Sequence, residues 1–205
     1  MKTQKEKTLE LVQLSMLAAL VVVLQLLSAL IPPIAGMVSI TLTLIPVVIG
    51  AILFGKKGGA ILGFVFGLIV LINCIAGLDP GGNILWTVNP ILTALLCIIK
   101  GVAAGFVPAA VYSAVMKDEK IGDKAKTPLT LVAAVLAPVV NTSIFVVGML
   151  LFFKDTLTVW ANGEPILSYI LVGLAGINFT IEFLINILLT PAIIRIVDVV
   201  KKKRH

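Results

Sequence analysis

The sequence predicts an all-α membrane protein, a six-transmembrane-helix bundle with the N and C termini on the cytoplasmic side. Of its 205 residues 60% are hydrophobic and only 13% are charged, and the mean hydropathy is +1.16. A soluble globule of this size cannot hide that much apolar surface in one core, so lipid must solvate the chain. Because a bilayer core of ~30 Å takes ~20 apolar residues per helix, residues 1–205 fit one integral membrane domain of about six spans.

Apolar runs between turn signals place these spans. We expect them at about residues 8–31, 40–54, 59–76, 88–116, 128–153 and 165–200. Pro32-Pro33 ends the first run, the turn Gly55 to Gly58 separates the second from the third, and Thr127-Pro128 begins the fifth. Residues 77–87 and 154–164 are expected to be outer loops.

The distribution of basic residues predicts the orientation. With the N-terminus inside, fourteen of the sixteen Lys and Arg residues lie on the cytoplasmic side, Lys154 lies outside, and Lys100 lies within a span. Basic residues resist translocation, so this asymmetry supports both the span count and the direction. The lysines before the first apolar run imitate a signal peptide, but no clear cleavage site follows and more spans do, so we expect helix 1 there.

The sequence lacks the residues that several classes of function require. The net charge of +6 is not gathered on one face with aromatics, as nucleic-acid binding requires. Cys74 and Cys97 are isolated in apolar runs, which favours packing over a metal site or a disulfide. The single histidine is His205, and no nucleophile with a base and no phosphate-binding loop appears. We therefore expect no enzyme activity, no cofactor and no metal.

Small residues recur at helical spacing in three of the expected spans. Gly59, Gly63 and Gly67 form one bare face, and Gly101 and Gly105 form another. Such faces let helix backbones approach closely in lipid, either inside the bundle or against another protein. Ser15 and Ala19 make a third small pair in the first span.

Two ionisable residues, Lys100 and Glu182, fall inside expected spans, where a charge is costly and marks a functional hypothesis. At ~1.5 Å per residue, Lys100 lies roughly 25 Å above Lys117, and Glu182 roughly 20 Å above Arg195. Asn141 lies roughly 22 Å from Lys126 by the same measure. All three reach a similar level in the outer half of the membrane.

Helical phase groups further polar residues with these charges. Asn178, Glu182 and Asn186 share one stripe of the last span, and a second stripe of the fourth span carries Asn89, Thr93 and Lys100. Both stripes are expected to face inward, and Asn89-Pro90 to break or cap the fourth span near the outer surface. The candidate substrate-binding residues are Lys100, Asn141, Glu182, Asn178, Asn89 and Thr93.

Two interpretations of these groups remain open. Lys100 and Glu182 can pair with each other while the asparagines tie helices together. Alternatively they line a pocket open to the outside, where the ammonium holds a substrate carboxylate and the amides and Glu182 hold hydroxyl or amide groups. Trp86 and Trp160, at outer span ends, are interfacial anchors or lids over such a pocket.

Because the chain has no ATP-binding motif, active uptake needs an ion gradient or a borrowed motor. The chain resembles the substrate-binding S components of energy-coupling factor (ECF) vitamin transporters over nearly its whole length. The resemblance rests on the span number and on three segments, which are Ser15 to Ala19, Ile52 to Gly63 and Lys100 to Gly105.

The resemblance implies a subunit of the prokaryotic plasma membrane that captures a vitamin outside and docks on one transmembrane coupling subunit and two ATPases. In that family a small pair in helix 1, here Ser15 and Ala19, forms the docking face; its first position is more often alanine. ATP hydrolysis then topples the loaded S component and delivers the ligand to the cytoplasm.

Within the family, the pantothenate branch is the most similar. Its motifs resemble Thr87 to Pro90, Asn141-Thr142 and Asn178 to Glu182. Members of that branch carry arginine where Lys100 stands and histidine where Leu44 stands, and a lysine keeps the charge without the bidentate fork. The leading ligand is pantothenate, with riboflavin or another micronutrient as the alternative. An autonomous ion-coupled carrier or channel, with Lys100 and Glu182 relaying protons, and an assembly subunit without a ligand are the competing functions.

Overall fold

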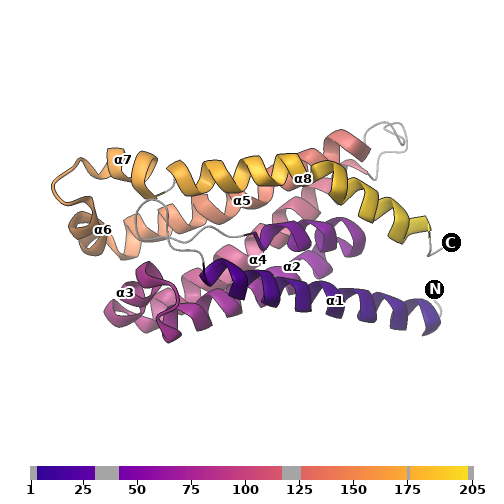
Figure 1. Ribbon diagram of the computed structural model, residues 1–205, viewed down its shortest axis with the longest axis horizontal. Coiled ribbons are helices and arrows are strands. Elements are labelled where there is room, and N and C mark those ends of the chain that lie inside the picture. Colours follow the sequence, from indigo (N-terminus) through magenta and orange to yellow (C-terminus); the bar gives the residue numbers. More distant parts are fainter. Residues whose placement is uncertain (1–3, 31–41, 117–125, 175, 203–205) are drawn as a thin grey trace.

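The computed structural model describes residues 4–30, 42–116, 126–174 and 176–202, and the regular elements of this part are all helices (Figure 1). The elements are α1 (Gln4–Ala29), α2 (Leu44–Ala76), α3 (Pro80–Val88), α4 (Pro90–Val115), α5 (Lys126–Phe152), α6 (Lys154–Ala161), α7 (Ile166–Tyr169), the π-helical turn η2 (Ile170–Leu174) and α8 (Gly176–Lys202). The all-α class is confirmed.

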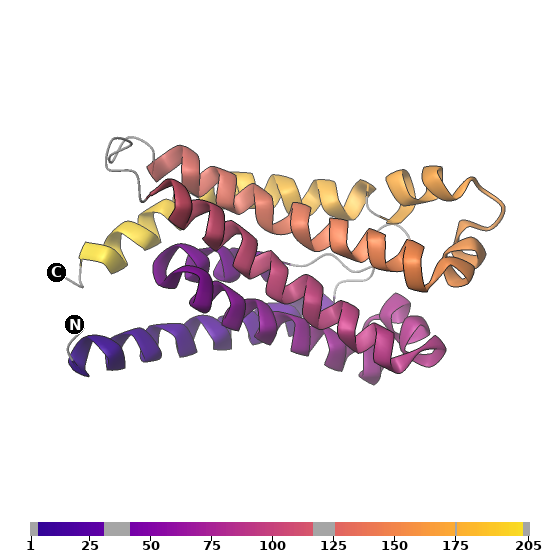
Figure 2. The same ribbon diagram turned by 180° about the vertical axis from the view of Figure 1, so that it is seen from behind.

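The long helices run along one elongated bundle (Figures 1 and 2). α1 begins and α8 ends at one end of it, while α3, α6 and α7 lie at the opposite end. Among the described residues, five helices are long and apolar enough to cross a membrane: 4–29, 44–76, 90–115, 127–152 and 179–200. The predicted membrane character is therefore confirmed.

α2 contains a break at the predicted turn. Gly55 has φ 66° and ψ −158°, which is not helical, and glycine adopts this positive φ without steric cost. A Cβ on Gly50 would touch Leu62, and one on Gly59 would touch Ala51. Residues 8 to 12 apart meet in this way only if the chain reverses, so residues 44–54 and 56–76 form a helical hairpin.

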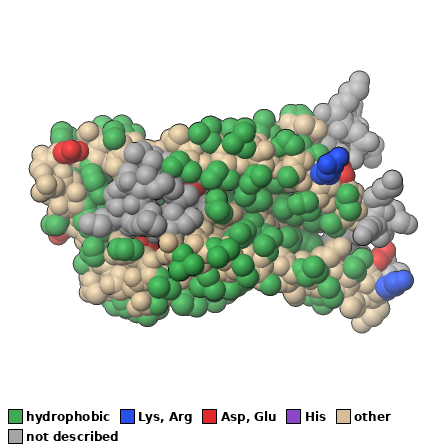
Figure 3. Space-filling model, in the orientation of Figure 1, with side chains coloured by type: hydrophobic (Ala, Val, Ile, Leu, Met, Phe, Trp, Pro, Cys, Tyr) green, Lys and Arg blue, Asp and Glu red, His purple; other side chains and the backbone are tan. Residues whose placement is uncertain are grey.

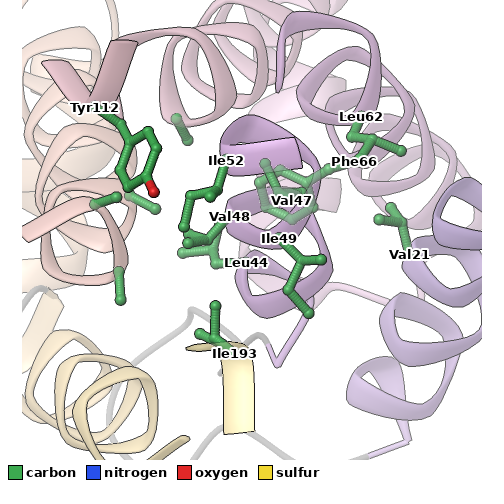
Figure 4. Close-up of a cluster of buried hydrophobic side chains, with 14 of the residues drawn as sticks. Val21, Leu44, Val47, Val48, Ile49, Ile52, Leu62, Phe66, Tyr112 and Ile193 are labelled. Carbon is green, nitrogen blue, oxygen red and sulfur yellow. The ribbon is translucent and has the colours of Figure 1, made fainter. Parts of the chain in front are cut away.

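The first half of α2 forms the centre of the main core. Six of its apolar side chains are 5% exposed or less, and they pack between the other helices (Figure 4): Leu44, Val47, Val48, Ile49, Ala51 and Ile52. Around it lie Val21 of α1, Leu62 and Phe66 of the second half of α2, Tyr112 of α4 and Ile193 of α8. At ~1.5 Å per residue this half is about 16 Å long, too short to cross a ~30 Å hydrocarbon core alone. Protein covers most of its surface, and Ile45, Leu53 and Phe54 are partly buried.

The two glycine faces meet each other. A Cβ on Gly63 would collide with the carbonyl oxygen of Gly101, and one on Gly59 with the carbonyl oxygen of Gly105. Gly67 lies in the same way against the carbonyl oxygen of Cys97. We name this contact the glycine interface of α2 and α4. Of the two interpretations of these glycines, packing inside the bundle is therefore the correct one.

The prediction of an outer loop at residues 77–87 is wrong, because Pro80–Val88 form α3. Asp79 is its N-cap and accepts a hydrogen bond from the backbone N–H of Gly82 at 3.3 Å, with Pro80 in the first turn. The Asn83 side-chain amide donates to the carbonyl oxygen of Cys74 at 2.9 Å and holds α3 against α2. Asp-Pro is a helix-start signal, because Asp caps the helix and Pro fits its first turn, but hydropathy alone does not detect it.

The last part of the chain also differs from the prediction. The expected outer loop 154–164 contains α6, and the expected span 165–200 is divided into α7, η2 and α8. Hydropathy measures how apolar a segment is and does not show whether its helix is continuous. The three elements were therefore predicted as one span. Their packing differs: Ile170 belongs to a small core with Leu85, Leu96 and Leu157, whereas the buried face of α8 faces α5 and α2.

Replacing Gly63 by leucine should destabilise the fold, because the side chain would push α2 away from the Gly101 backbone. Overpacking of this kind costs about 1–3 kcal/mol, or roughly 2–12 °C in apparent melting temperature. Thermal aggregation of the detergent-purified chain, followed by size-exclusion chromatography, measures the shift. Leu68→Phe is the control, since Leu68 is exposed on the same helix; equal shifts in both variants would contradict the close contact.

Candidate functional site

The start of α4 is fixed by Asn89, which ends α3 and caps α4. Its backbone is extended, with φ −153° and ψ 99°, and its Oδ1 accepts the N–H of Leu92 at 3.1 Å. Pro90 fills the first turn, where no N–H donor is needed. The predicted break and cap are confirmed. The Asn89 side-chain oxygen is already engaged in this cap.

Lys100 lies on the inner side of α4, as predicted from helical phase. It is half-buried, and its Nζ is 4.8 Å from the centre of the Phe145 ring of α5, a cation–π contact. It lines a small cavity together with Thr93, Asp79, Cys74 and Cys97, among others. Thr93 is 1% exposed, and its hydroxyl donates to the carbonyl oxygen of Asn89 at 2.9 Å. The cavity measures about 20 Å³, enough for about one water molecule.

Asp79 is the acidic neighbour of Lys100 that the sequence analysis did not select. Burial raises the pKa of its carboxyl above the ordinary 3.8, while the backbone N–H of Gly82, the charge of Lys100 and the N–H of Gly81 act in the opposite direction. Asp79 was missed because its segment was interpreted as a loop. The Asp-Pro-Gly-Gly motif, as a helix start, was the available signal.

A second polar region follows the inner face of α8. Glu182, Asn186 and Thr190 are 5%, 2% and 5% exposed and continue into the apolar side chains of Ile193 and Val197. The Asn186 amide donates to the Glu182 carbonyl oxygen at 2.8 Å, and the Thr190 hydroxyl donates to the Asn186 carbonyl oxygen at 2.8 Å. The predicted inward stripe is thus present for Glu182 and Asn186. The side chain of Asn178, its third member, lies outside the described part.

Lys100 and Glu182 do not form the direct ion pair that was one of the two interpretations. In the described part of the chain, Lys100 contacts the Phe145 ring and neighbours Asp79, and no ion pair joins it to Glu182. The reason is the arrangement of the helices, since α4 and α8 both pack on α5 and make little contact with each other. The two charges therefore lie on separate walls of the bundle.

Three buried amide oxygens lack a hydrogen-bond partner among the described residues. They are the Oδ1 atoms of Asn73, Asn141 and Asn186. Asn141, a predicted site residue, is 8% exposed in α5, the helix against which α8 packs. An unsatisfied buried polar group costs about 1–3 kcal/mol, so each of these oxygens is a candidate contact for water or a polar ligand. Asn186, four residues after Glu182, could have been selected from that spacing.

The proposed docking pair is open to the surroundings. Ser15 and Ala19 are both exposed, and their neighbour Met16 is 68% exposed. α1 packs chiefly on α2. The hydroxyl of Thr43 donates to Gln25 Oε1 at 2.7 Å and fixes the far half of α1 to the start of α2.

Trp86 lies in α3 and Trp160 in α6. Both are half-buried. Trp160 packs against the small core that contains Leu96, Met149 and Phe153. This contact fits either of the two predicted roles, an interfacial anchor or a lid.

Apolar helices around buried charges and amides define a multi-pass membrane protein with a polar interior, the arrangement that solute transporters use. The family model described as Thiamine transporter protein (Thia_YuaJ) matches residues 11–198, and the chain belongs to this family. The chain is also 27% identical over 200 residues to the pantothenic acid transporter PanT of Lactococcus lactis subsp. cremoris (strain MG1363), covering 93% of this chain and 94% of that protein. These findings confirm the resemblance to ECF S components of the pantothenate-type branch and place the chain in the bacterial plasma membrane.

The raised pKa of Asp79 predicts a pH-dependent stability. The folded state holds this proton more tightly than the unfolded chain, so the contribution is complete below the ordinary pKa of 3.8 and is lost as pH rises through the folded-state value. Asp79→Asn keeps a capping side chain and removes the titration. Its melting temperature relative to the parent should rise as the pH increases from below the ordinary pKa of 3.8 through the folded-state value. A difference that shrinks over this range would show that Lys100, and not burial, dominates at Asp79.

Proposed function

We propose that the chain is the substrate-binding S component of an ECF-type transporter and that it captures pantothenate from outside the cell. The family match over residues 11–198 carries this proposal, together with the similarity to a pantothenic acid transporter over 200 residues. The polar groups on the inner faces of α4, α5 and α8 support it.

We further propose six membrane-embedded segments, counting the two halves of α2 separately, with both termini in the cytoplasm. The basic residues support this orientation. On the face seen in Figure 3, Lys and Arg side chains lie at the end where α1 begins and α8 ends, and hydrophobic side chains cover the middle. The end with α3, α6 and α7 then faces outside, so Lys100, which lies near Asp79 and the start of α4, is in the outer half.

The chemistry of pantothenate suits these groups. It carries one carboxylate, two hydroxyls and an amide. The Lys100 ammonium would bind the carboxylate, while Asn141, Asn178 and Glu182 would bind the hydroxyl and amide groups. Asn89 and Thr93 would hold the first turn of α4 in place. Because the cavity at Lys100 measures about 20 Å³, entry of the vitamin requires the walls around it to separate.

The charge of the ligand distinguishes the vitamins. Thiamine, named in the family description, is a cation and would be repelled by Lys100 and attracted by Glu182. Pantothenate is an anion, and Lys100 favours it. Riboflavin carries no charge that would pair with Lys100 or Glu182, so it is the alternative ligand and not the leading one.

Uptake by this proposal needs partners. The chain would dock through Ser15 and Ala19 on a transmembrane coupling subunit, which two ATPase subunits energise. An autonomous ion-coupled carrier would instead accumulate its solute in vesicles that contain this chain alone. Uptake in such vesicles that depends on a gradient and not on the ATPases would replace our proposal.

Calorimetry of the purified chain against pantothenate, thiamine and riboflavin tests the ligand. We expect pantothenate to bind. Lys100→Ala and Glu182→Ala should each weaken its affinity by about 10- to 100-fold, the effect of losing a hydrogen bond to a charged group. Glu164→Ala, an exposed acidic residue, is the matched control. Unchanged affinity in both site variants would place the pocket elsewhere.

Ser15→Trp and Ala19→Trp test the docking face. A ring on this face should keep helix backbones apart and abolish most uptake by the full complex, while calorimetric binding of the vitamin is retained. Leu188→Trp on α8, where Leu188 is 74% exposed, controls for an added ring facing lipid. Full uptake by both α1 variants would refute this docking face.

A further inference from the structure

An apolar groove lies between α4 and α5, on the side of these helices that faces away from the polar interior. α4 and α5 lie side by side in Figure 2. The groove measures about 320 Å³, and its lining includes Leu95 and Ile99 of α4 and Ser143, Val147 and Leu151 of α5. Except for the Ser143 hydroxyl, its accessible lining side chains are hydrocarbon. Leu96 lines both this groove and the small cavity at Lys100, so its side chain lies between the two.

The groove is open to the membrane. Leu95, Ile99 and Val147 on its edges are 51%, 53% and 52% exposed, so no helix of the described chain covers it. Gly148 lies at its floor without a side chain, in contact with Leu96 below. The missing side chain deepens the hollow between the two helices.

A basic residue, Lys154, follows one end of the groove along the chain. Leu151 and Phe152 form that end, where α5 stops, and Lys154 begins α6 two residues later. Two Cα–Cα steps span at most about 7.6 Å, so the exposed Lys154 lies next to the groove. When the Lys and Arg residues outside the expected spans are assigned to the two sides of the membrane, Lys154 is the one basic residue on the side opposite the termini.

We propose that this groove is a binding site for a phospholipid, with an acyl chain lying between α4 and α5 and an anionic headgroup at Lys154. A peptide segment or a polar solute would leave its hydrogen-bonding groups unpaired against this lining, whereas an acyl chain has none to satisfy. The ammonium of Lys154 adds electrostatic attraction for a phosphodiester, and more for a lipid with net negative charge. The occupant is therefore lipid, and the headgroup sets the preference.

Native mass spectrometry tests this proposal on the full chain, purified in detergent and supplied with equal amounts of phosphatidylglycerol and phosphatidylcholine. We expect one retained phosphatidylglycerol. Val147→Trp, which fills the groove, should lower the lipid-bound fraction at least about fivefold, and Lys154→Gln should retain lipid but lose the preference for phosphatidylglycerol. Leu151→Trp is a second filling variant should Val147→Trp misfold.

The controls separate this site from general lipid contact and from the vitamin site. Leu188→Trp and Asp155→Asn, both at exposed positions away from the lining, should leave lipid retention unchanged. Pantothenate binding, measured in parallel, should not change in Val147→Trp. No retained lipid in the parent chain, or equal retention in Val147→Trp, would overturn the proposal. Loss of complex assembly by Val147→Trp without loss of lipid would also overturn it, in favour of a protein partner.

Discussion

The rest of the structure depends on the backbone contact between α2 and α4. Because Gly59, Gly63 and Gly67 lie directly against carbonyl oxygens of α4, the two helices approach more closely than side chains would allow. In lipid, where packing replaces the hydrophobic effect, such contacts hold the bundle together. The contact at Cys97 lies one turn before Lys100, so the glycine interface also sets the position of the cation over the Phe145 ring and beside Asp79.

On this rigid pair the remaining helices arrange two polar regions, which the structure keeps apart. One contains Lys100, Asp79 and Thr93 at the α3 end of α4, and the other contains Glu182 and Asn186 on α8. α5 lies between α4 and α8 and contributes Asn141 and Phe145. A charge in hydrocarbon and an unsatisfied amide are both costly, and a ligand that joins the two regions would relieve that cost. This arrangement gives a physical reason for the polar groups in a chain that is otherwise apolar.

Much of this could be predicted from the sequence because lipid imposes simple rules. The helical period predicted correctly that Glu182, Asn186 and Thr93 face inward. The spacing of small residues predicted that α2 and α4 each carry a face for close helix packing, and the structure shows that these two faces meet. The break at Gly55 followed from a glycine-lysine turn. The short helices α3 and α6 were not predicted, because they are too short for a hydropathy pattern. The cap residue Asp79 was a signal for α3, whereas Phe153, at the N-cap of α6, forms no side-chain cap. The absence of a Lys100–Glu182 pair could not be predicted either, because depth and phase say nothing about which helices are neighbours.

The most direct test of the central claim, that an anionic vitamin reaches the polar interior from outside, is the accessibility of Asn141. In a chain whose Cys74 and Cys97 are replaced by alanine, Asn141→Cys would be alkylated in right-side-out vesicles with a membrane-impermeant thiol reagent. The account predicts labelling from outside that pantothenate slows and thiamine does not. Labelling from the cytoplasmic side only, or labelling that pantothenate leaves unchanged, would contradict it.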